Sequence, residues 1–348
     1  MADSNELFKA FNGIIKLSDS NRNILRGVRD SLRQKMWKRF ATIPLDQIGT
    51  NKIDFQTQGS YVMDTIITPY DDDFDLDDGV YFLGNLSREQ RPTTKQFHDW
   101  VLFVVGEDEN YAKVTDKDTC VRVRYSKEKF HIDLPIYYSN NFKSPDLAHL
   151  KENWKLSGPV EFIAWFENKI GSNFQESFIL ESNRFAEFQT WKTDIRKTDA
   201  QLRRIVRYLK AWADNLRGDM PPGIIMTILA GENYKANERD DVSLRDTLVN
   251  IKSYLKANGC KCPRPTTPKN EDLFESYSET KKKYFLDRLD TFVDSANQAI
   301  ANPNYKEACL KWQKHLGSRF PCSMIKDEMP YVKSYPKAAV IGDNAQSA

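Results

Sequence analysis

The chain has 348 residues, of which 40% are hydrophobic and 29% charged, as in an ordinary soluble protein with one large core or two modest ones. Its 51 Lys and Arg residues nearly balance its 49 Asp and Glu residues, so the charge gives no sign of the broad basic face of an RNA-binding enzyme. The N-terminus is neither a signal nor a transit peptide, and no apolar run reaches the roughly 18 residues of a membrane span. We therefore expect a cytoplasmic protein without a membrane partner.

The first part of the chain has a helical pattern. Leu7, Phe8 and Phe11 keep the three- and four-residue spacing of an apolar helix face. This spacing predicts helical structure over residues 5–40, with an interruption at 18–20, where small polar residues gather.

The middle of the chain predicts a small mixed sheet with one helix. Aromatic and β-branched residues gather there in short runs between polar turns, which is typical of strands. The predicted strands are residues 61–62, 74–77, 80–82, 121–125 and 130–138, and residues 94–106 have helical spacing.

From residue 160 onward the pattern is helical again. Residues 201–216 are the clearest case, because their apolar side chains form one continuous stripe. Further helices are predicted at residues 159–168, 223–230, 243–258, 277–301 and 305–316. The proline-rich stretch 262–268 predicts a rigid, extended connector.

These elements predict an α+β fold with two domains. A long N-terminal helix and a mixed-sheet core occupy residues 1–158, and a helical C-terminal lobe occupies residues 159–335. Residues 336–348 are small, and polar at their end, so we expect a flexible tail.

The five cysteines are Cys120, Cys260, Cys262, Cys309 and Cys322. An odd number in a long chain argues against a secreted disulfide framework. Cys260 and Cys262 form a CxC pair, and no second pair stands at the spacing of a zinc site. We interpret the cysteines as buried or loop thiols in a reducing compartment.

Three carboxylates, Asp75, Asp77 and Asp133, form the most informative pattern. Side chains alternate along a strand, so Asp75 and Asp77 point to one face, with Cα atoms about 6.6 Å apart. This arrangement suits a pair of divalent ions roughly 3.5–4 Å apart, and Asp133 on a later apolar segment would complete the site. Carboxylate and phosphate oxygens favour Mg²⁺, so the pattern predicts metal-dependent nucleotide transfer in which Asp133 accepts the proton of the attacking hydroxyl.

Other interpretations of the acidic run compete with this one. Asp71, Asp72 and Asp73 are expected in a solvated loop, and Asp77-Asp78-Gly79 is compatible with a plain turn. A calcium loop is excluded, because counting from Asp71 or Asp73 places neither Gly at the sixth position nor Glu at the twelfth.

Gly59 and Ser60 form a turn that suits phosphate. Glycine lets the backbone approach a phosphate closely, and the following amides with the Ser60 hydroxyl can donate to the β- and γ-phosphates. Lys210, on the predicted helix 201–216, could reach the triphosphate or stay solvated beside the apolar stripe. Arg122 could bind a phosphate or a purine edge, or pair with an acidic residue.

The stretches QGSYVMDT, FDLDDGVYF and FHIDLPIYY resemble, in this order, the motifs of the nucleotidyltransferase superfamily. DLDDGVY, RRIVRYLKAW and KWQKHLGSRFP resemble one branch, the bacterial cGAS/DncV-like nucleotidyltransferases, which make cyclic oligonucleotide signals in anti-phage defence. The resemblance covers nearly the whole chain and implies a polymerase-beta-like catalytic core.

The resemblance also implies roles for single residues. Mg²⁺, or Mn²⁺ in its place, would be held by Asp75, Asp77 and Asp133. The nucleotides would be bound by Gln58, Gly59 and Ser60 at the donor triphosphate, by Lys210 at a phosphate and by Arg122 in the nucleotide pocket. One position departs from the pattern: relatives often carry a serine where Gly223 stands, so we expect no nucleotide contact from it.

The resemblance implies a partner as well. In many such systems a ubiquitin-transfer-like protein joins the synthase to a target through its C-terminal residue, which here is Ala348. A merely frayed terminus fits the tail equally well. The chain shows no zinc-ribbon insertion like that of the animal DNA sensor, so no DNA activator is expected.

Three functions are compatible with these residues. The first is an enzyme that joins nucleoside triphosphates, such as ATP and GTP, into a cyclic di- or trinucleotide second messenger. The second is a nucleotidyltransferase that acts on an RNA end or a small-molecule hydroxyl. The third is a catalytically silent nucleotide-binding module, which the presence of all three carboxylates disfavours.

Overall fold

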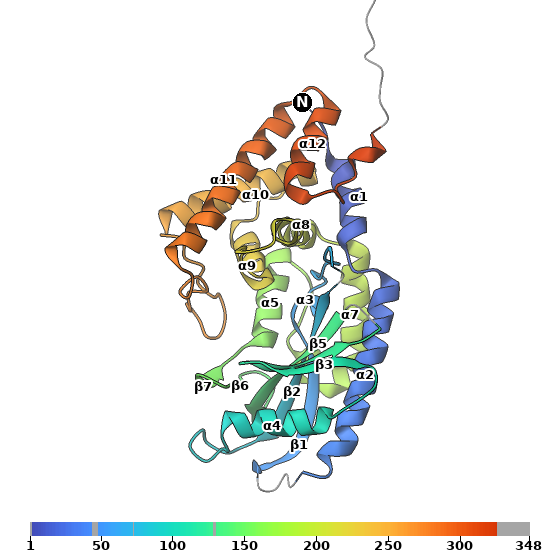
Figure 1. The fold of residues 1–348 in the computed structure, drawn as a ribbon, viewed down its shortest axis with the longest axis vertical. Coiled ribbons are helices and arrows are strands. Elements are labelled where there is room, and N and C mark those ends of the chain that lie inside the picture. Colours follow the sequence, from blue (N-terminus) through green and yellow to red (C-terminus); the bar gives the residue numbers. More distant parts are fainter. Residues whose placement is uncertain (1, 44–47, 72, 128–129, 326–348) are drawn as a thin grey trace, which may run out of the picture.

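The structure is a computed structural model that describes residues 2–43, 48–71, 73–127 and 130–325. Two lobes are stacked along its long axis, with a mixed sheet at one end and a helical bundle at the other (Figure 1). The predicted tail 336–348, with the candidate conjugation residue Ala348, lies outside the described residues. None of the described helices has both the length and the apolar character needed to cross a bilayer.

Seven strands form one mixed sheet. They are β1 (Thr50–Thr57), β2 (Phe74–Gly84), β3 (Tyr111–Asp116), β4 (Cys120–Tyr125), β5 (Phe130–Ser139), β6 (Asp146–His149) and β7 (Asn153–Leu156). Their order is β1-β2-β5-β4-β3, and β6 pairs with both β5 and β7. The parallel strands β2 and β5 place Asp77 beside Asp133 and Asp75 beside His131. Because neighbouring residues in register point to the same face, the three aspartates share one face of the sheet.

Strand β2 changes character along its length. In its first half, Phe74 and Leu76 are buried, whereas Asp75 is exposed and Asp77 is half-buried. From Asp78 to Phe82 every residue is buried. The beginning of the strand therefore has one face in the core and one face available to a ligand.

The helices before and around the sheet are α1 (Asn5–Ile15), α2 (Asp19–Phe40), α3 (Gly59–Val62) and α4 (Thr94–Val105). Ser18 caps α2 by accepting a hydrogen bond from the backbone N–H of Asn21, which confirms the predicted interruption at 18–20.

The helical lobe follows the sheet in sequence. It contains α5 (Pro159–Ile170), α6 (Ser177–Leu180), α7 (Phe185–Thr198), α8 (Gln201–Leu216), α9 (Gly223–Asn233), α10 (Asp240–Ala257), α11 (Glu279–Ala301) and α12 (Tyr305–Leu316), with the 3₁₀ turns η2 (Ser182–Arg184) and η3 (Cys322–Met324). The five helices predicted after residue 216 or at 159–168 are all present, with ends shifted by a few residues.

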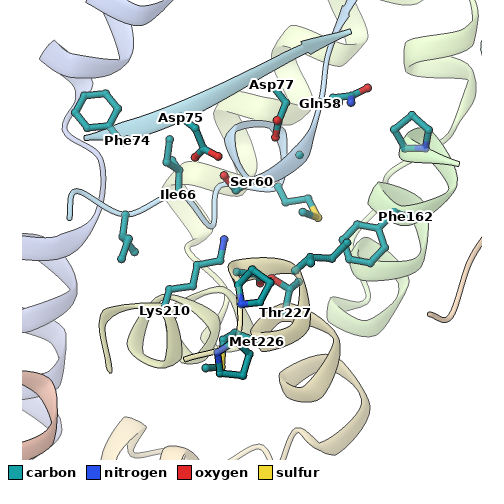
Figure 2. A pocket seen from close by; sticks show the side chains of 18 of the residues that line it. Gln58, Ser60, Ile66, Phe74, Asp75, Asp77, Phe162, Lys210, Met226 and Thr227 are labelled. Atoms are coloured by element: carbon teal, nitrogen blue, oxygen red, sulfur yellow. The ribbon is translucent and has the colours of Figure 1, made fainter. Parts of the chain in front are cut away.

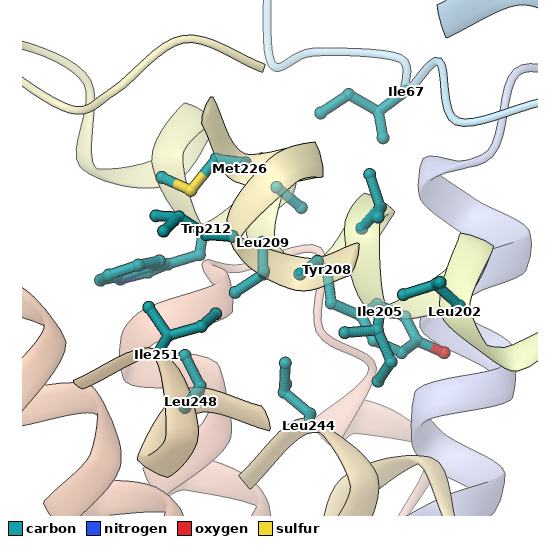
Figure 3. Close-up of a cluster of buried hydrophobic side chains, with 14 of the residues drawn as sticks. Ile67, Leu202, Ile205, Tyr208, Leu209, Trp212, Met226, Leu244, Leu248 and Ile251 are labelled. Atoms are coloured by element: carbon teal, nitrogen blue, oxygen red, sulfur yellow. The ribbon is translucent and has the colours of Figure 1, made fainter. Parts of the chain in front are cut away.

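Each lobe has its own hydrophobic core. One core lies between the sheet and the helices α2 and α4 and includes Phe97. The other surrounds α8, whose Leu209 and Trp212 pack near Leu248 of α10 (Figure 3). Helix α1 joins this second core through Phe8, although it precedes the sheet in sequence. The predicted division between residues 158 and 159 stays a prediction. Helix α1 was assigned to the first domain, but it packs in the core of the helical lobe.

Some local predictions were wrong. Residues 61–62 lie in the short helix α3 and not in a strand, because the chain turns sharply at Gly59, whose φ is 65°. Residues 74–77 and 80–82 belong to the single strand β2, so there is no plain turn at Asp78. The strands β1, β3, β6 and β7 and the helices α6 and α7 were not predicted.

The prediction of free thiols was wrong for one pair of cysteines. Cys309 and Cys322 form a disulfide with Cα atoms 5.7 Å apart, because the chain reverses at Gly317 after α12 and brings η3 back beside it. Cys120, Cys260 and Cys262 are free and buried.

Candidate active site

Gly59 lies directly against the carboxylate of Asp77. Its φ of 65° is in the left-handed region that favours glycine, and a β-carbon at this position would overlap Oδ2 of Asp77. The backbone N–H of Gln58 donates to the carbonyl of Asp77 at 3.0 Å, which ties the turn to strand β2. The turn that carries Ser60 therefore meets the acidic strand only because residue 59 has no side chain.

A cavity of about 520 Å³ opens between the two lobes over this turn. The predicted site residues on its wall are Gln58, Gly59, Ser60, Asp75, Asp77 and Lys210. Figure 2 shows Asp75, Asp77 and Ser60 on one side, with Lys210 pointing toward them from α8. Phe162 and Met226 belong to the apolar part of the wall. A charged end and apolar sides are the usual features of a small-molecule site.

Other carboxylates crowd Asp77. Burial, followed by the negative charges of Asp75 and Asp133, raises the pKa of Asp77 well above its usual range, and Lys210 and Arg122 lower it in part. A divalent cation would remove this repulsion, and carboxylate oxygens are the donors that Mg²⁺ prefers. The donor set therefore fits magnesium, although no three acidic, His or Cys side chains within the described part of the chain already form a metal cage.

The third carboxylate is held away from the cavity wall. Arg122 and Asp133 face each other across β4 and β5, and the guanidinium donates to both carboxylate oxygens, from Nε and Nη2, at 2.6 Å each. Neither residue lines the cavity. Of the alternatives for Arg122, the structure has the pairing with an acidic residue, so both oxygens of Asp133 already accept hydrogen bonds from Arg122.

Lys210 extends into the cavity instead of lying solvated beside α8. Its Nζ donates to the carbonyl oxygen of Thr65 at 3.1 Å and lies 3.4 Å from Thr65 Oγ1. Burial lowers the pKa of Lys210 to about 8, and Asp75 and Asp77 raise it in part. Because neither hydrogen bond goes to a carboxylate, the ammonium group remains available to an anionic ligand.

The side-chain amide of Gln58 is already bonded within the site. Its Nε2 donates to the hydroxyl of Tyr137 at 2.9 Å, and the hydroxyl of Tyr81 donates to its Oε1 at 3.4 Å. The rings of Tyr81 and Tyr137 stack with centroids 4.7 Å apart. The amide of Gln58 thus anchors the Gly59-Ser60 turn to the two tyrosines of the sheet. Its contact with a triphosphate stays a prediction.

Sequence reasoning missed three residues at this site. Asp73 was expected in a solvated loop, yet it lines the cavity, accepts a hydrogen bond from Arg124 at 2.6 Å and lies 2.9 Å from Nδ1 of His131. Strand alternation could have identified His131, because it stands two residues before Asp133. Arg264 also lines the cavity, and its position as a lone cation among prolines was the available signal.

Sequence comparison identifies related proteins. Residues 53–137, which hold the Gly59-Ser60 turn and all three aspartates, match the family described as cyclic GMP-AMP synthase DncV-like, nucleotidyltransferase domain. A cyclic GMP-AMP synthase of Vibrio cholerae is 25% identical over 322 residues, which cover 82% of this chain and 72% of that protein. One of Escherichia coli is 28% identical over 300 residues, which cover 78% of this chain and 68% of that protein.

Solved structures share the fold. Vibrio cholerae DncV in complex with nonhydrolyzable GTP has a TM-score of 0.68 at 17% identity, covering 92% of this chain and 97% of that one. The same enzyme with the linear intermediate 5′ pppA(3′,5′)pG also has a TM-score of 0.68 at 17% identity, covering 91% and 96% of the two chains. The mixed sheet and helical lobe thus share the nucleotidyltransferase fold of DncV, and residues 53–137 match the family of DncV-like nucleotidyltransferase domains.

Proposed function

We propose that the chain joins two nucleoside triphosphates, ATP and GTP, into a cyclic dinucleotide and releases one pyrophosphate at each of two steps. The observation that carries this proposal is the meeting of the Gly59-Ser60 turn with Asp75 and Asp77 in one cavity, opposite Lys210. The names of the relatives support ATP and GTP as the two substrates.

Each step would be an in-line displacement at phosphorus. A ribose hydroxyl oxygen attacks the α-phosphorus of the other nucleotide, the bond from that phosphorus to the bridging oxygen breaks, and pyrophosphate leaves. The linear intermediate would then bind the same cavity in the reverse direction for the closing step.

The residues of the chain would bind and orient the donor. The backbone N–H groups after Gly59 and the Ser60 hydroxyl would donate to the β- and γ-phosphates. Lys210 would offset the charge that collects on the departing pyrophosphate. We assign the proton of the attacking hydroxyl to Asp133, once Arg122 has moved away from it.

Asp75, Asp77 and Asp133 would hold Mg²⁺, with Mn²⁺ as a substitute. The carboxylate donor set and the raised pKa of Asp77 support this assignment. Such an ion, when bound, supplies a lower pKa for the attacking hydroxyl and neutralises part of the triphosphate charge.

The biological setting is proposed from the resemblance of the motifs. We propose that the enzyme acts in the cytoplasm, in anti-phage signalling by cyclic nucleotides. A ubiquitin-transfer-like protein would join the carboxyl group of Ala348 to a target. No DNA activator is proposed.

Product analysis tests the reaction. Purified protein is incubated with all four labelled ribonucleoside triphosphates and Mg²⁺ or Mn²⁺, treated with phosphatase, and examined by chromatography and mass spectrometry. We expect a phosphatase-resistant cyclic dinucleotide, which Asp77→Asn should abolish and Asp287→Asn, at an exposed carboxylate of α11, should leave unchanged. Pyrophosphate release only with an added RNA or small-molecule acceptor would favour that class of enzyme, and nucleotide binding without turnover would favour a silent module.

A further inference from the structure

Arg264 is a cation on the cavity wall that lies far from the aspartates in sequence. It lies in the connector between α10 and α11 and lines the same cavity as Asp75 and Asp77. It also lines a second, smaller cavity of about 260 Å³. Arg264 therefore belongs to the walls of both cavities.

Hydrogen bonds fix this residue at both its backbone and its side chain. Its backbone N–H donates to the carbonyl of Glu271 at 2.8 Å, and its carbonyl accepts from the N–H of Asn270 at 2.9 Å. Its Nε donates to Oε2 of Glu271 at 2.8 Å, and Oε1 of that carboxylate lies 3.4 Å from Nζ of Lys155 on β7. The guanidinium is therefore held by one edge and cannot turn freely.

The Nη atoms of the guanidinium are free to bind a ligand. Within the described part of the chain, neither Nη atom of Arg264 has a hydrogen-bond partner, and neither is among the buried unpartnered atoms. Two parallel N–H donors thus remain accessible in a fixed plane. A planar ligand edge with two adjacent acceptors would match them.

The surroundings suit a flat apolar ring. Pro159, Phe162, Pro222 and Met226 line the same cavity as Arg264. Thr267 lies in the same connector, and its backbone N–H donates to Glu161 of α5 at 3.0 Å, which fastens the connector to the helical lobe beside Pro159. A nucleotide with its phosphates at Ser60 and Lys210 would extend its base along these apolar walls.

We propose that Arg264 selects guanine for one of the two nucleotides, by donating from its Nη atoms to the O6 and N7 acceptors of the base. Of the two purines, only guanine presents two adjacent acceptors on its N7 edge, whereas adenine presents an N6 donor beside N7 and would set donor against donor. Glu271 acts as the positioning residue that holds the guanidinium in plane. This inference rests on the proposed function, because it concerns the base of a nucleotide bound at that same site.

Base analogues test the contact directly. Inosine triphosphate keeps O6 and N7, and 7-deaza-GTP lacks only the N7 acceptor. We measure binding of GTP, inosine triphosphate, 7-deaza-GTP and ATP to the full chain by calorimetry, without divalent metal, and incorporation of each into product by mass spectrometry. Wild type should prefer GTP and inosine triphosphate over 7-deaza-GTP by about tenfold to a hundredfold.

Variants of the connector complete the test. Arg264→Ala should remove the preference for GTP over 7-deaza-GTP and leave ATP affinity unchanged, and Arg264→Lys should restore little of it, because an ammonium group cannot bind two acceptors in a plane. Glu271→Gln should weaken the preference partly. The matched control is Lys269→Ala, which removes an exposed cation from the same connector and should change nothing.

The outcomes separate this inference from the proposed function. Equal use of GTP and 7-deaza-GTP by the wild type, or an unchanged ratio in Arg264→Ala, would overturn it. An equal loss of affinity for ATP and GTP in Arg264→Ala would also overturn it, by making the arginine a phosphate ligand. A cyclic product without guanine would overturn the role of Arg264 and the choice of GTP as a substrate, but would leave cyclic dinucleotide synthesis itself in place. Base selection in binding without any cyclic product would instead support the role of Arg264 and contradict the proposed synthesis.

Discussion

Arg122 holds both carboxylate oxygens of Asp133 across the β4–β5 pair. The same carboxylate is one of the two that raise the pKa of Asp77, so the arginine competes with any metal ion for the third side chain of the site. Removing the guanidinium should therefore favour metal binding in the absence of nucleotide.

Arg122→Gln should bind Mn²⁺ about tenfold more tightly than the wild type, which corresponds to about 1.4 kcal/mol. Electron paramagnetic resonance of free Mn²⁺ measures this without turnover. The double variant Arg122→Gln/Asp133→Asn separates release of the carboxylate from simple loss of a positive charge. If the double variant keeps the tighter binding, Asp133 is not the group that Arg122 restrains.

Gly59→Ala should abolish synthesis, since a β-carbon would displace the carboxylate of Asp77. A left-handed alanine should also cost about 1–2 kcal/mol of unfolding free energy. The control is Gly171→Ala, because Gly171 has φ of 73° but nothing within 4 Å of its added carbon. Urea unfolding should detect a similar loss in both variants, and product analysis should detect loss only in Gly59→Ala. Full activity in Gly59→Ala would contradict the close packing of turn and strand.

The ion pair between Arg203 of α8 and Glu167 of α5 is completely buried, and Arg203 also donates to the carbonyl of Met63 at 2.6 Å. Glu167→Gln should lower the unfolding free energy by about 3–5 kcal/mol, because it leaves a buried guanidinium without its counter-charge. Glu187→Gln, in the solvent-exposed pair with Arg184, should cost less than about 1 kcal/mol.

The double variant Glu167→Met/Arg203→Leu separates stability from function. It should recover at least about 2 kcal/mol relative to Glu167→Gln, because no buried charge remains. The double variant should not recover full activity, because the carbonyl of Met63 loses the hydrogen bond from Arg203. Met63 follows the Gly59-Ser60 turn closely, so this loss should disturb the turn. Denaturant unfolding and product analysis on the same preparations decide between these effects.

Stability should fall in mild acid because of His315. The ring is buried, stacks on Phe292 with centroids 4.6 Å apart, and lies 2.8 Å from the Ser295 hydroxyl. Burial, with smaller effects of Lys314 and Arg288, lowers the pKa of His315 to about 4. The unfolded chain, with its histidine near 6.5, binds more protons between these values, so stability is lost as pH falls from about 6.5 toward 4.

His315→Gln removes this dependence and serves as the test. Between pH 7 and pH 4, the wild type should lose up to about 3 kcal/mol more unfolding free energy than the variant. Urea midpoints at four pH values measure the difference. Parallel pH profiles for the two proteins would show that the buried histidine does not titrate as proposed.

The parts of the site that depend on local chemistry could be predicted from the sequence. The alternation around Asp75 and Asp77 and the glycine before Ser60 act within a few residues, so their consequences are visible in the chain itself. The amphipathic stripe of α8 likewise places Lys210 at the edge of its buried face. Each of these features was found without knowledge of long-range pairing.

The parts of the site that depend on the register between strands could not be predicted from the sequence. The pairing of Arg122 with Asp133 requires β4 to lie beside β5 with those two residues in register, and no local pattern specifies that register. The edge strand β3 was missed because its residues are partly exposed, so no alternation of apolar side chains marks it. Helix α3 is too short, at four residues, to show a helical period.

Helix α1 packs in the helical lobe, whereas α2 begins after only three intervening residues and packs on the sheet. The chain returns to the helical lobe through residues 157–158, between β7 and α5. The segment after α3 also links the lobes, because Asp64 pairs with Arg207 and the carbonyl of Met63 accepts from Arg203, both on α8. Since Ser157 and Gly158 line the cavity, the crossing of the chain at these residues forms part of the wall that a nucleotide would meet.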